Sequence, residues 1–396
     1  MTLPNYSAHA SHWSIDSNVV YLNHGSFGAT PSAVLAKQRT YQDAMEHQAI
    51  DYFIQQLPNL IQESKSCLAQ YVGTSNHNII FTPNTTTGVN TILNSLTANA
   101  GDHWLNTNHG YGACNRAFAH YAHKQRCVLD TVIIDYPITD ASHILTAIEA
   151  AITPHTTTAL IDYITSASAI IFPIAEIIAL LHSKGIQVIV DAAHAPGMVP
   201  FAIDELKPDY LVANCHKWLC SPKGSAFVYV APQHQEHIHP LIISHYNDVA
   251  PTSPMHWSNQ YMWDGTHDYS AYIAVQHAIN YLPTILGTGW LGVMNHNKSL
   301  ALQGATIIAN KLSVALPAPD HMLGSIINIP LPQGIVGDYA FHSTTQFKDM
   351  LLSKYGIEVP INFFPVAPTQ WLRISAQLYN SIAQYEYLAH CLLAEL

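Results

Sequence analysis

The sequence predicts an α/β fold with a mostly parallel seven-stranded sheet, helices on both sheet faces and a smaller C-terminal α+β domain. Between residues 78 and 230, short apolar runs alternate with amphipathic stretches, the order typical of a parallel sheet covered on both faces. From about residue 285 the pattern changes to a long helix followed by proline-punctuated segments. At 396 residues the chain is also too long for one small core.

We therefore expect three parts: an N-terminal arm and loop over residues 1–30, a large domain over residues 31–284 and a small domain over residues 285–396. Two amphipathic runs, 142–152 and 174–185, are predicted helices, and the second ends at a Lys-Gly pair as helices commonly do. Seven apolar runs are predicted strands: residues 78–82, 103–107, 127–135, 158–164, 185–191, 209–215 and 225–230.

The composition favours a globular protein that acts on a small molecule. Hydrophobic residues make up 48% of the chain and charged residues 10%, which excludes disorder driven by charge. The net charge is −11 and no basic run occurs, so we expect no nucleic acid and no anionic membrane as partner. Among 25 histidines, the cluster at 234–240 is a candidate metal site. Since no ligand pattern frames it, we interpret it as a solvated loop and expect no metal.

Cysteine usage and the N-terminus indicate the compartment. The six cysteines show no CxxC pair, which favours a reducing environment. The first residues lack a basic region followed by an apolar core, and no uninterrupted apolar run of about 18 residues occurs. We expect a cytoplasmic protein.

The candidate site residues follow the predicted strands, because ligands bind beyond the carboxyl ends of strands in open parallel sheets. After the first strand, Thr85 and Thr86 begin a helix whose exposed N–H groups suit a phosphate, although ordinary N-capping also explains them. Tyr111 stands between two glycines and is placed to stack on a planar ligand, or is simply a core or surface ring.

Charged residues follow the later strands. Asp191 ends a strand, where burial requires a positive partner, and His194 is three residues away; a helix cap is the alternative. Ser166 follows the fourth strand. Lys217 lies between two apolar strands, where a lysine either extends to solvent or loses its charge and becomes nucleophilic.

Together these features predict pyridoxal 5'-phosphate (PLP) as the cofactor. It needs a phosphate anchor, a stacking ring, a partner for its pyridine nitrogen and a lysine for a Schiff base. Nicotinamide and ATP sites would need GxGxxG or GxxxxGK[ST], and neither motif is present.

The chain also resembles the class V aminotransferase family of fold-type I PLP enzymes, and within it the isopenicillin N epimerase-like group. The resemblance spans residues 21–380, and it implies a homodimer with sites at the subunit interface and residues 31–284 as the PLP-binding domain. The matching motifs are YLNHGSFGATP (21–31), TPNTTTGVN, YGA, DAAHAPG, HKWLCSPKG, WDGTHDYSAY and LRISAQLYN.

The resemblance implies a role for each matching position. Lys217 would hold the cofactor as a Schiff base and Asp191 would pair with its pyridine nitrogen. His194 would reach the ring hydroxyl with Ser166 nearby, and Tyr111 would stack on the ring.

Phosphate and substrate contacts follow in the same way. Thr85, Thr86 and His216 would hold the phosphate, with Thr266 supplied by the other subunit. Arg373 would clamp the substrate carboxylate, although a surface salt bridge is the ordinary fate of an arginine. Asn23 and His24, in the 21–31 motif, are expected on a loop that closes over the substrate and faces it.

The reaction stays open among three outcomes at the α-carbon of an amino acid: epimerisation, β-elimination of a sulfur or similar substituent, and transamination with a keto-acid acceptor. Lys217 is the expected general base. Family desulfurases carry a cysteine shortly before the substrate arginine, and residues 355–373 contain none, which argues against desulfurase action. A PLP-binding protein without turnover is the remaining alternative.

Overall fold

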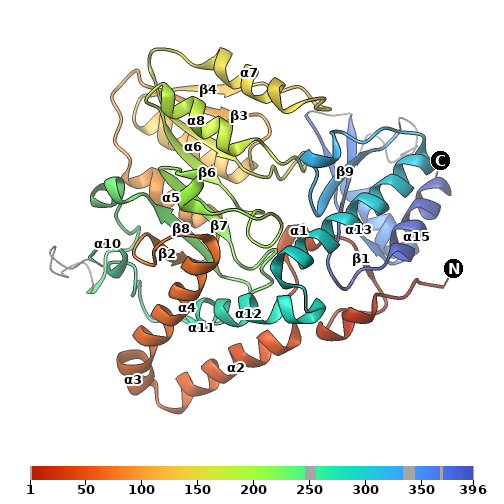
Figure 1. The fold of residues 1–396 in the computed structure, drawn as a ribbon, viewed down its shortest axis with the longest axis horizontal. Coiled ribbons are helices and arrows are strands. Elements are labelled where there is room, and N and C mark those ends of the chain that lie inside the picture. Colours follow the sequence, from red (N-terminus) through yellow and green to blue (C-terminus); the bar gives the residue numbers. More distant parts are fainter. Residues whose placement is uncertain (1, 246–255, 333–343, 366–368, 396) are drawn as a thin grey trace.

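The computed structural model describes residues 2–245, 256–332, 344–365 and 369–395. A large lobe is built on a seven-stranded sheet, and a smaller lobe at the other side of the molecule contains the C-terminal strands and helices, with both chain termini nearby (Figure 1). The fold class predicted from the sequence is confirmed.

The central sheet has the strand order β2-β8-β7-β6-β5-β3-β4, and all neighbours are parallel except those that involve β8. Each of the seven predicted apolar runs forms one strand, with the largest difference at the third run, where β4 covers only five of the nine residues. The strands are β2 (Ile79–Thr82), β3 (His103–Thr107), β4 (Val128–Val132), β5 (Thr156–Asp162), β6 (Gln187–Asp191), β7 (Tyr210–Asn214) and β8 (Ala226–Val230).

Both faces of this sheet are buried, which explains the near-continuous apolar runs. Along β6, Val188 and Val190 enter one core and Ile189 enters the other. One face is covered by α5 (Thr85–Ser95) and α6 (Gly112–Lys124), and the other by α4 (Leu57–Val72), α7 (Ala141–Ala151) and α8 (Ile174–Ser183).

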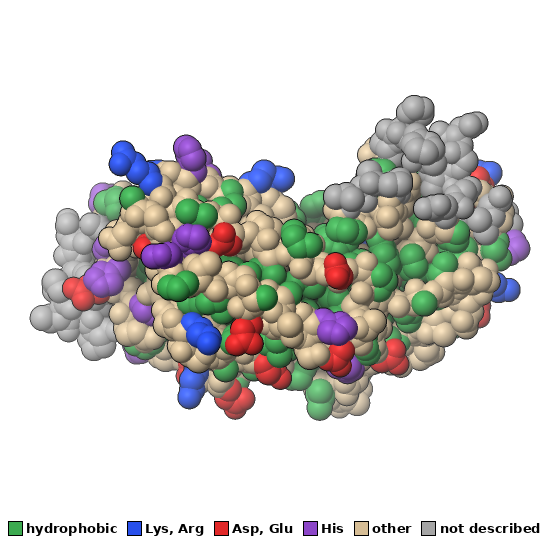
Figure 2. Space-filling view, turned by 90° about the horizontal axis from the view of Figure 1, so that it is seen from above, with side chains coloured by type: hydrophobic (Ala, Val, Ile, Leu, Met, Phe, Trp, Pro, Cys, Tyr) green, Lys and Arg blue, Asp and Glu red, His purple; other side chains and the backbone are tan. Residues whose placement is uncertain are grey.

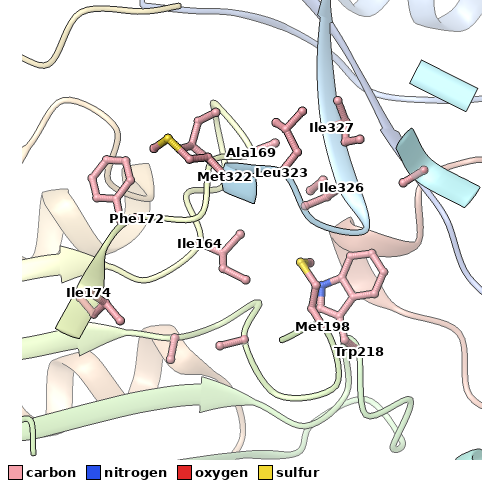
Figure 3. Close-up of a cluster of buried hydrophobic side chains, with 14 of the residues drawn as sticks. Ile164, Ala169, Phe172, Ile174, Met198, Trp218, Met322, Leu323, Ile326 and Ile327 are labelled. Carbon is pink, nitrogen blue, oxygen red and sulfur yellow. The ribbon is translucent and has the colours of Figure 1, made fainter. Parts of the chain in front are cut away.

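The smaller lobe contains an antiparallel sheet of order β11-β12-β9. Its strands are β9 (Ile326–Pro330), β11 (Ile361–Phe363) and β12 (Gln370–Ser375), and its helices are α13 (Gly289–Leu312), α14 (Thr344–Tyr355) and α15 (Ile382–Leu393). Ile326 of β9 shares one buried cluster with Met198 and Trp218 from loops at the edge of the large sheet (Figure 3). The two lobes therefore share a continuous core.

The first residues of the chain join the two lobes. Strand β1 (Val20–Tyr21) pairs in parallel with β10 (Ile357–Glu358) of the smaller lobe, and α1 (His24–Phe27) follows it. At the end of α1, Gly28 has φ +70°, and a Cβ there would lie 2.0 Å from the carbonyl oxygen of His216. Only glycine permits this approach to the turn that carries Lys217.

Helices α2 (Ser32–His47), α11 (Ser270–Ile273) and α12 (Val275–Leu286) lie along one side of the large lobe, where α2 runs beneath the other two (Figure 1). The remaining short helices are α3 (Ala49–Asp51), α9 (Ile203–Leu206) and α10 (His256–Asn259), with 3-10 helices at Ala8–His12, Pro232–His237 and Asp320–Met322 and a π-helical turn at Tyr52–Gln56. Within the described ranges, no helix has the length and apolar character needed to span a bilayer.

Gly28→Ala tests the contact between the N-terminal segment and the lysine turn. We expect the free energy of unfolding to fall by about 2–5 kcal/mol, because strain at positive φ adds to a steric clash with backbone. Gly287→Ala is the matched control, since Gly287 has φ +69° and a Cβ there would meet no atom within 4 Å, and we expect about 1 kcal/mol there. Urea unfolding measures both, and equal losses would contradict the clash.

Candidate active site

Two buried carboxylates stand side by side where β5 and β6 end. Asp162 and Asp191 are register partners on these neighbouring strands. Asp162 Oδ2 accepts the backbone N–H of Tyr111 at 3.1 Å, and Asp191 Oδ1 accepts that of Ala193 at 3.0 Å. Burial raises the pKa of Asp191, and burial together with the neighbouring Asp191 charge raises that of Asp162 well above its ordinary value. Charge on this pair therefore needs a positive partner.

Lys217 follows β7, and its amine meets a histidine. Its Nζ lies 3.0 Å from His194 Nε2, and His194 Nδ1 accepts the indole N–H of Trp218 at 3.1 Å. Part of Lys217 is accessible, yet the surroundings of its amine are enclosed enough that burial lowers its pKa to about 8, against the opposing effect of Asp191. Burial, and next the Lys217 charge, hold the pKa of His194 well below its ordinary value. The lysine is thus disposed to act as a free amine.

The N-terminus of α5 points toward the same edge. Helix α5 packs so closely on the sheet that a Cβ on Gly88 would lie 2.5 Å from Val212 Cγ1. Asn84 caps the helix by accepting the N–H of Thr87 at 2.8 Å, and Asn214 at the end of β7 accepts that of Thr85 at 3.1 Å. The capping role considered for the threonines is therefore taken by Asn84.

His216 lies beside Lys217 and is oriented by the backbone. Its Nδ1 donates to the carbonyl of Ser225 at 2.8 Å, which leaves Nε2 as the nitrogen for a ligand. Burial lowers its pKa to about 4, so the ring is neutral without an anion nearby. A bound phosphate would raise that pKa by favouring the protonated ring.

Arg373 is a buried cation without an acidic partner. It lies on β12 with 7% of its surface exposed, and no carboxylate of the described residues forms an ion pair with it. Its Nη1 donates to the carbonyl oxygen and hydroxyl of Ser166 at 2.7 and 3.3 Å, and its Nη2 donates to Ser26 Oγ at 2.9 Å. The Nε–H has no acceptor among the described residues. Burial lowers its pKa to about 10, which leaves the guanidinium charged and in need of an anion.

The two residues expected to face a substrate behave differently. Asn23 reaches the arginine indirectly, since its Oδ1 accepts the Ser26 hydroxyl at 2.5 Å. His24 has 0% exposure; it accepts the Tyr379 hydroxyl at Nδ1 (2.9 Å) and donates from Nε2 to the Lys217 carbonyl (3.0 Å). The expectation that His24 faces the substrate is therefore wrong in this structure, because both ring nitrogens bind protein groups; the ring holds the lysine turn instead.

The other candidates lie as follows. Tyr111 precedes α6 with 43% exposure and makes no ring-to-ring contact with a described aromatic side chain, so its face is open. Ser166 contacts Arg373, and no contact joins it to His194. Thr86 follows Thr85 in the first turn of α5. Thr266 is exposed on the loop before α11, and no hydrogen bond in the described structure joins it to the residues above.

Sequence reasoning missed Asp162, Trp218 and Ser26. Asp162 ends an apolar strand in the same way as Asp191, so the same criterion identifies it. Trp218 and Ser26 act through contacts 24 and 347 residues away in the chain, which no local pattern indicates.

Three buried polar atoms are left for a ligand, and they suit PLP. None of these atoms forms a hydrogen bond with a nitrogen or oxygen atom of the described residues: Asp191 Oδ2, Thr85 Oγ1 and Arg373 Nε. The Asp191 carboxylate does accept the weakly donating thiol of Cys114. These atoms offer an acceptor for a pyridinium, a hydroxyl for a phosphate and a donor for a carboxylate. No group of three metal-binding side chains occurs in the described part of the chain, and His234 of the 234–240 cluster binds Asp209 at 2.7 Å.

Comparison with known proteins shows the family of the chain. Residues 20–388 match the sequence profile of the family Aminotransferase class-V. The chain is 26% identical over 405 residues to a putative L-cysteine desulfhydrase of Oryza sativa subsp. japonica (94% of this chain, 82% of that protein). It is 24% identical over 390 residues to isopenicillin N epimerase of Streptomyces clavuligerus (96% and 95%).

A solved structure shows the same fold. The cystine C–S lyase C-DES, in complex with cysteine persulfide, superposes with a TM-score of 0.77 at 16% identity and covers 95% of this chain and 97% of its own. The resemblance inferred from the sequence motifs is confirmed.

Buried neutral histidines predict how stability changes with pH. Burial lowers the pKa of His24 to about 3 and of His109 to about 4, below the ordinary 6.5. Between pH 6 and 4 the unfolded chain therefore binds more protons than the folded chain. As the pH is lowered through this range, the free energy of unfolding decreases by about 1.4 kcal/mol per pH unit for each such ring. Urea unfolding of His109→Gln at several pH values should show that the free energy of unfolding changes less steeply with pH, by about that amount per unit. The exposed His155→Gln is the control, and an unchanged slope in His109→Gln would contradict the assignment.

Proposed function

The chain belongs to the aminotransferase class-V family, and we propose that it is a PLP-dependent C–S lyase that eliminates the β-substituent of a cysteine-derived amino acid. The observation that carries the proposal is the buried guanidinium of Arg373, which has no carboxylate partner in the described structure and an unused Nε–H. A buried charge of this kind costs several kcal/mol unless an anion accompanies it. The α-carboxylate of an amino acid, bound through two parallel hydrogen bonds, supplies that anion.

The proposed roles follow the positions of the side chains. Lys217 would carry the cofactor and, once released, take the α-proton; Asp191 would accept from the pyridinium through Oδ2, and His194 would approach the ring hydroxyl. Thr85, Thr86 and His216 would hold the phosphate, and the open face of Tyr111 would lie on the ring. When bound, the cofactor supplies an electron sink for the α-carbanion.

The histidine contacts favour elimination over epimerisation. Epimerisation needs an acid on the face opposite Lys217, whereas elimination needs a single base. His24 and His109 each use both ring nitrogens in contacts within the chain, and His194 lies beside Lys217 itself, with its Nε2 3.0 Å from the amine. None of these three rings is therefore free to act as the second acid.

The cysteines argue against sulfur transfer to the protein. Burial raises the pKa of Cys220 to about 12 and raises that of Cys114 as well. Neither thiol is disposed to become a nucleophilic thiolate.

A second copy of the chain would complete the site. Thr266 is exposed, and no hydrogen bond in the described structure joins it to Lys217, His216 or Thr85 of its own chain. We place it against the phosphate of the partner's site, in a homodimer with shared active sites. The amino-acid substrate is the small-molecule partner of this assembly.

Turnover of S-substituted cysteines in heavy water tests the reaction type. We expect pyruvate, ammonia and a free thiol in equal amounts, with loss of all three in Lys217→Ala, because no other described amine borders Asp191. α-Deuterium with inversion would instead identify an epimerase, and a new keto acid that forms only with an acceptor would identify a transaminase.

Arg373→Gln tests carboxylate recognition. We expect kcat/KM for an S-substituted cysteine to fall about 10²–10³-fold, since charged hydrogen bonds are worth about 1.5–3 kcal/mol each. The matching S-substituted cysteamine lacks the carboxylate and should lose little. Equal losses for both substrates would show that Arg373 only supports the structure through Ser26 and Ser166.

Mixing two impaired variants tests the shared site. Lys217→Ala and Thr266→Ala subunits, each with reduced activity alone, should regain activity on dissociation and reassociation, since one site of each hybrid dimer is then intact. No regain, with hybrid dimers verified by native mass spectrometry, would place Thr266 within its own subunit's site or outside any site.

A further inference from the structure

Trp218 has a polar contact that none of the roles above uses. The side chain has 1% exposure and lies in the cluster between the lobes, close to Met198 and below Ile326 (Figure 3). Its only polar atom, Nε1, donates to His194 Nδ1 at 3.1 Å. Because an indole N–H can only donate, His194 Nδ1 must be the unprotonated nitrogen.

The position of the remaining ring proton follows. His194 is enclosed and neutral, so its single proton lies on Nε2. Nε2 is 3.0 Å from Lys217 Nζ, and the proton therefore points at the amine. An ammonium has no lone pair to accept it, whereas a neutral amine does.

We propose that Trp218 is a positioning residue that acts through the His194 ring to hold Lys217 as a neutral amine. An amine forms an imine with an aldehyde only through its lone pair, with loss of water, so a neutral Lys217 would be ready for the aldehyde that PLP would supply when bound. This consequence rests on the proposed function, but the proton arrangement does not.

The other groups around the amine act in opposite directions. Burial, the largest effect, and Arg373 disfavour the ammonium, while Asp191, Cys114 and Asp162 favour it. His24 donates to the Lys217 carbonyl rather than to its amine, and His216 is turned to Ser225. Among these groups, His194 is the one that gives a hydrogen bond to Nζ.

Competitive acylation of the full-length, cofactor-freed protein, read by mass spectrometry at Lys217, measures the pH midpoint of the amine. We expect the midpoint to rise by about one unit in Trp218→Phe, which lowers labelling about tenfold at pH values below the midpoint. The single ring proton can then move from Nε2 to Nδ1, which leaves Nε2 as an acceptor for the ammonium. An unchanged midpoint would overturn the proposal.

Two further measurements distinguish an effect of the Trp218 hydrogen bond from an effect of Trp218 packing. Trp104→Phe is the matched control, because Trp104 is fully buried and its Nε1 has no hydrogen-bond partner in the described structure; it should leave the Lys217 midpoint unchanged. In a His194→Gln background, Trp218→Phe should have no further effect on the midpoint, since Trp218 acts through the ring. A shift that persists there would assign Trp218 to packing alone.

If Trp218→Phe does not fold, the position of the His194 ring proton in the wild-type protein still tests the proposal. Nitrogen-15 NMR of the ring, assigned by its loss in His194→Gln, should show the proton on Nε2, and a proton on Nδ1 would overturn the proposal. A protein with the expected ring proton and midpoint that fails to bind PLP would contradict the proposed function and leave the role of Trp218 in place.

Discussion

Removal of charged groups from water is the constraint on which this molecule depends. Arg373, Asp162 and Asp191 are buried at the junction of the two sheets, and none of them has an ion-pair partner in the described structure. Each such group costs several kcal/mol, which a domain can sustain only with a large apolar core. The sheet supplies it, because both of its faces are covered by helices and the core continues into the smaller lobe. Stability is thereby given up for buried charges that the proposed cofactor and amino-acid substrate would neutralise.

Separate groups of residues fix the backbone and the amine of Lys217. The backbone of the turn is fixed by the hydrogen bond from His24 to the Lys217 carbonyl and by the close approach of Gly28. The amine contacts His194, whose ring is oriented by Trp218. Figure 2 shows a surface with few charged side chains and a hollow between the lobes in which hydrophobic side chains gather.

Much of the fold and part of the site could be predicted from the sequence. The seven strands were identified because a strand buried on both faces must be apolar along its length, and Asp191 and Lys217 were found because a parallel sheet presents its strand ends at one edge. His24 was misjudged for a physical reason: a glycine-flanked histidine has the same sequence pattern whether its ring faces a ligand or a carbonyl. Its partners, Lys217 and Tyr379, are 193 and 355 residues away, and contacts of that range leave no local periodicity.

The pairing of β1 with β10 has a consequence for synthesis of the chain. Ser7 N donates to the carbonyl of Tyr379, Asn380 Nδ2 donates to that of Tyr21, and Ser375 N donates to that of Leu22. Residues 7–22 therefore find their partners in residues 375–380, which leave the ribosome much later. The central sheet can assemble while translation continues, but the lysine turn is locked only after residue 380 has emerged, so a nascent chain has a formed sheet well before it has a formed site.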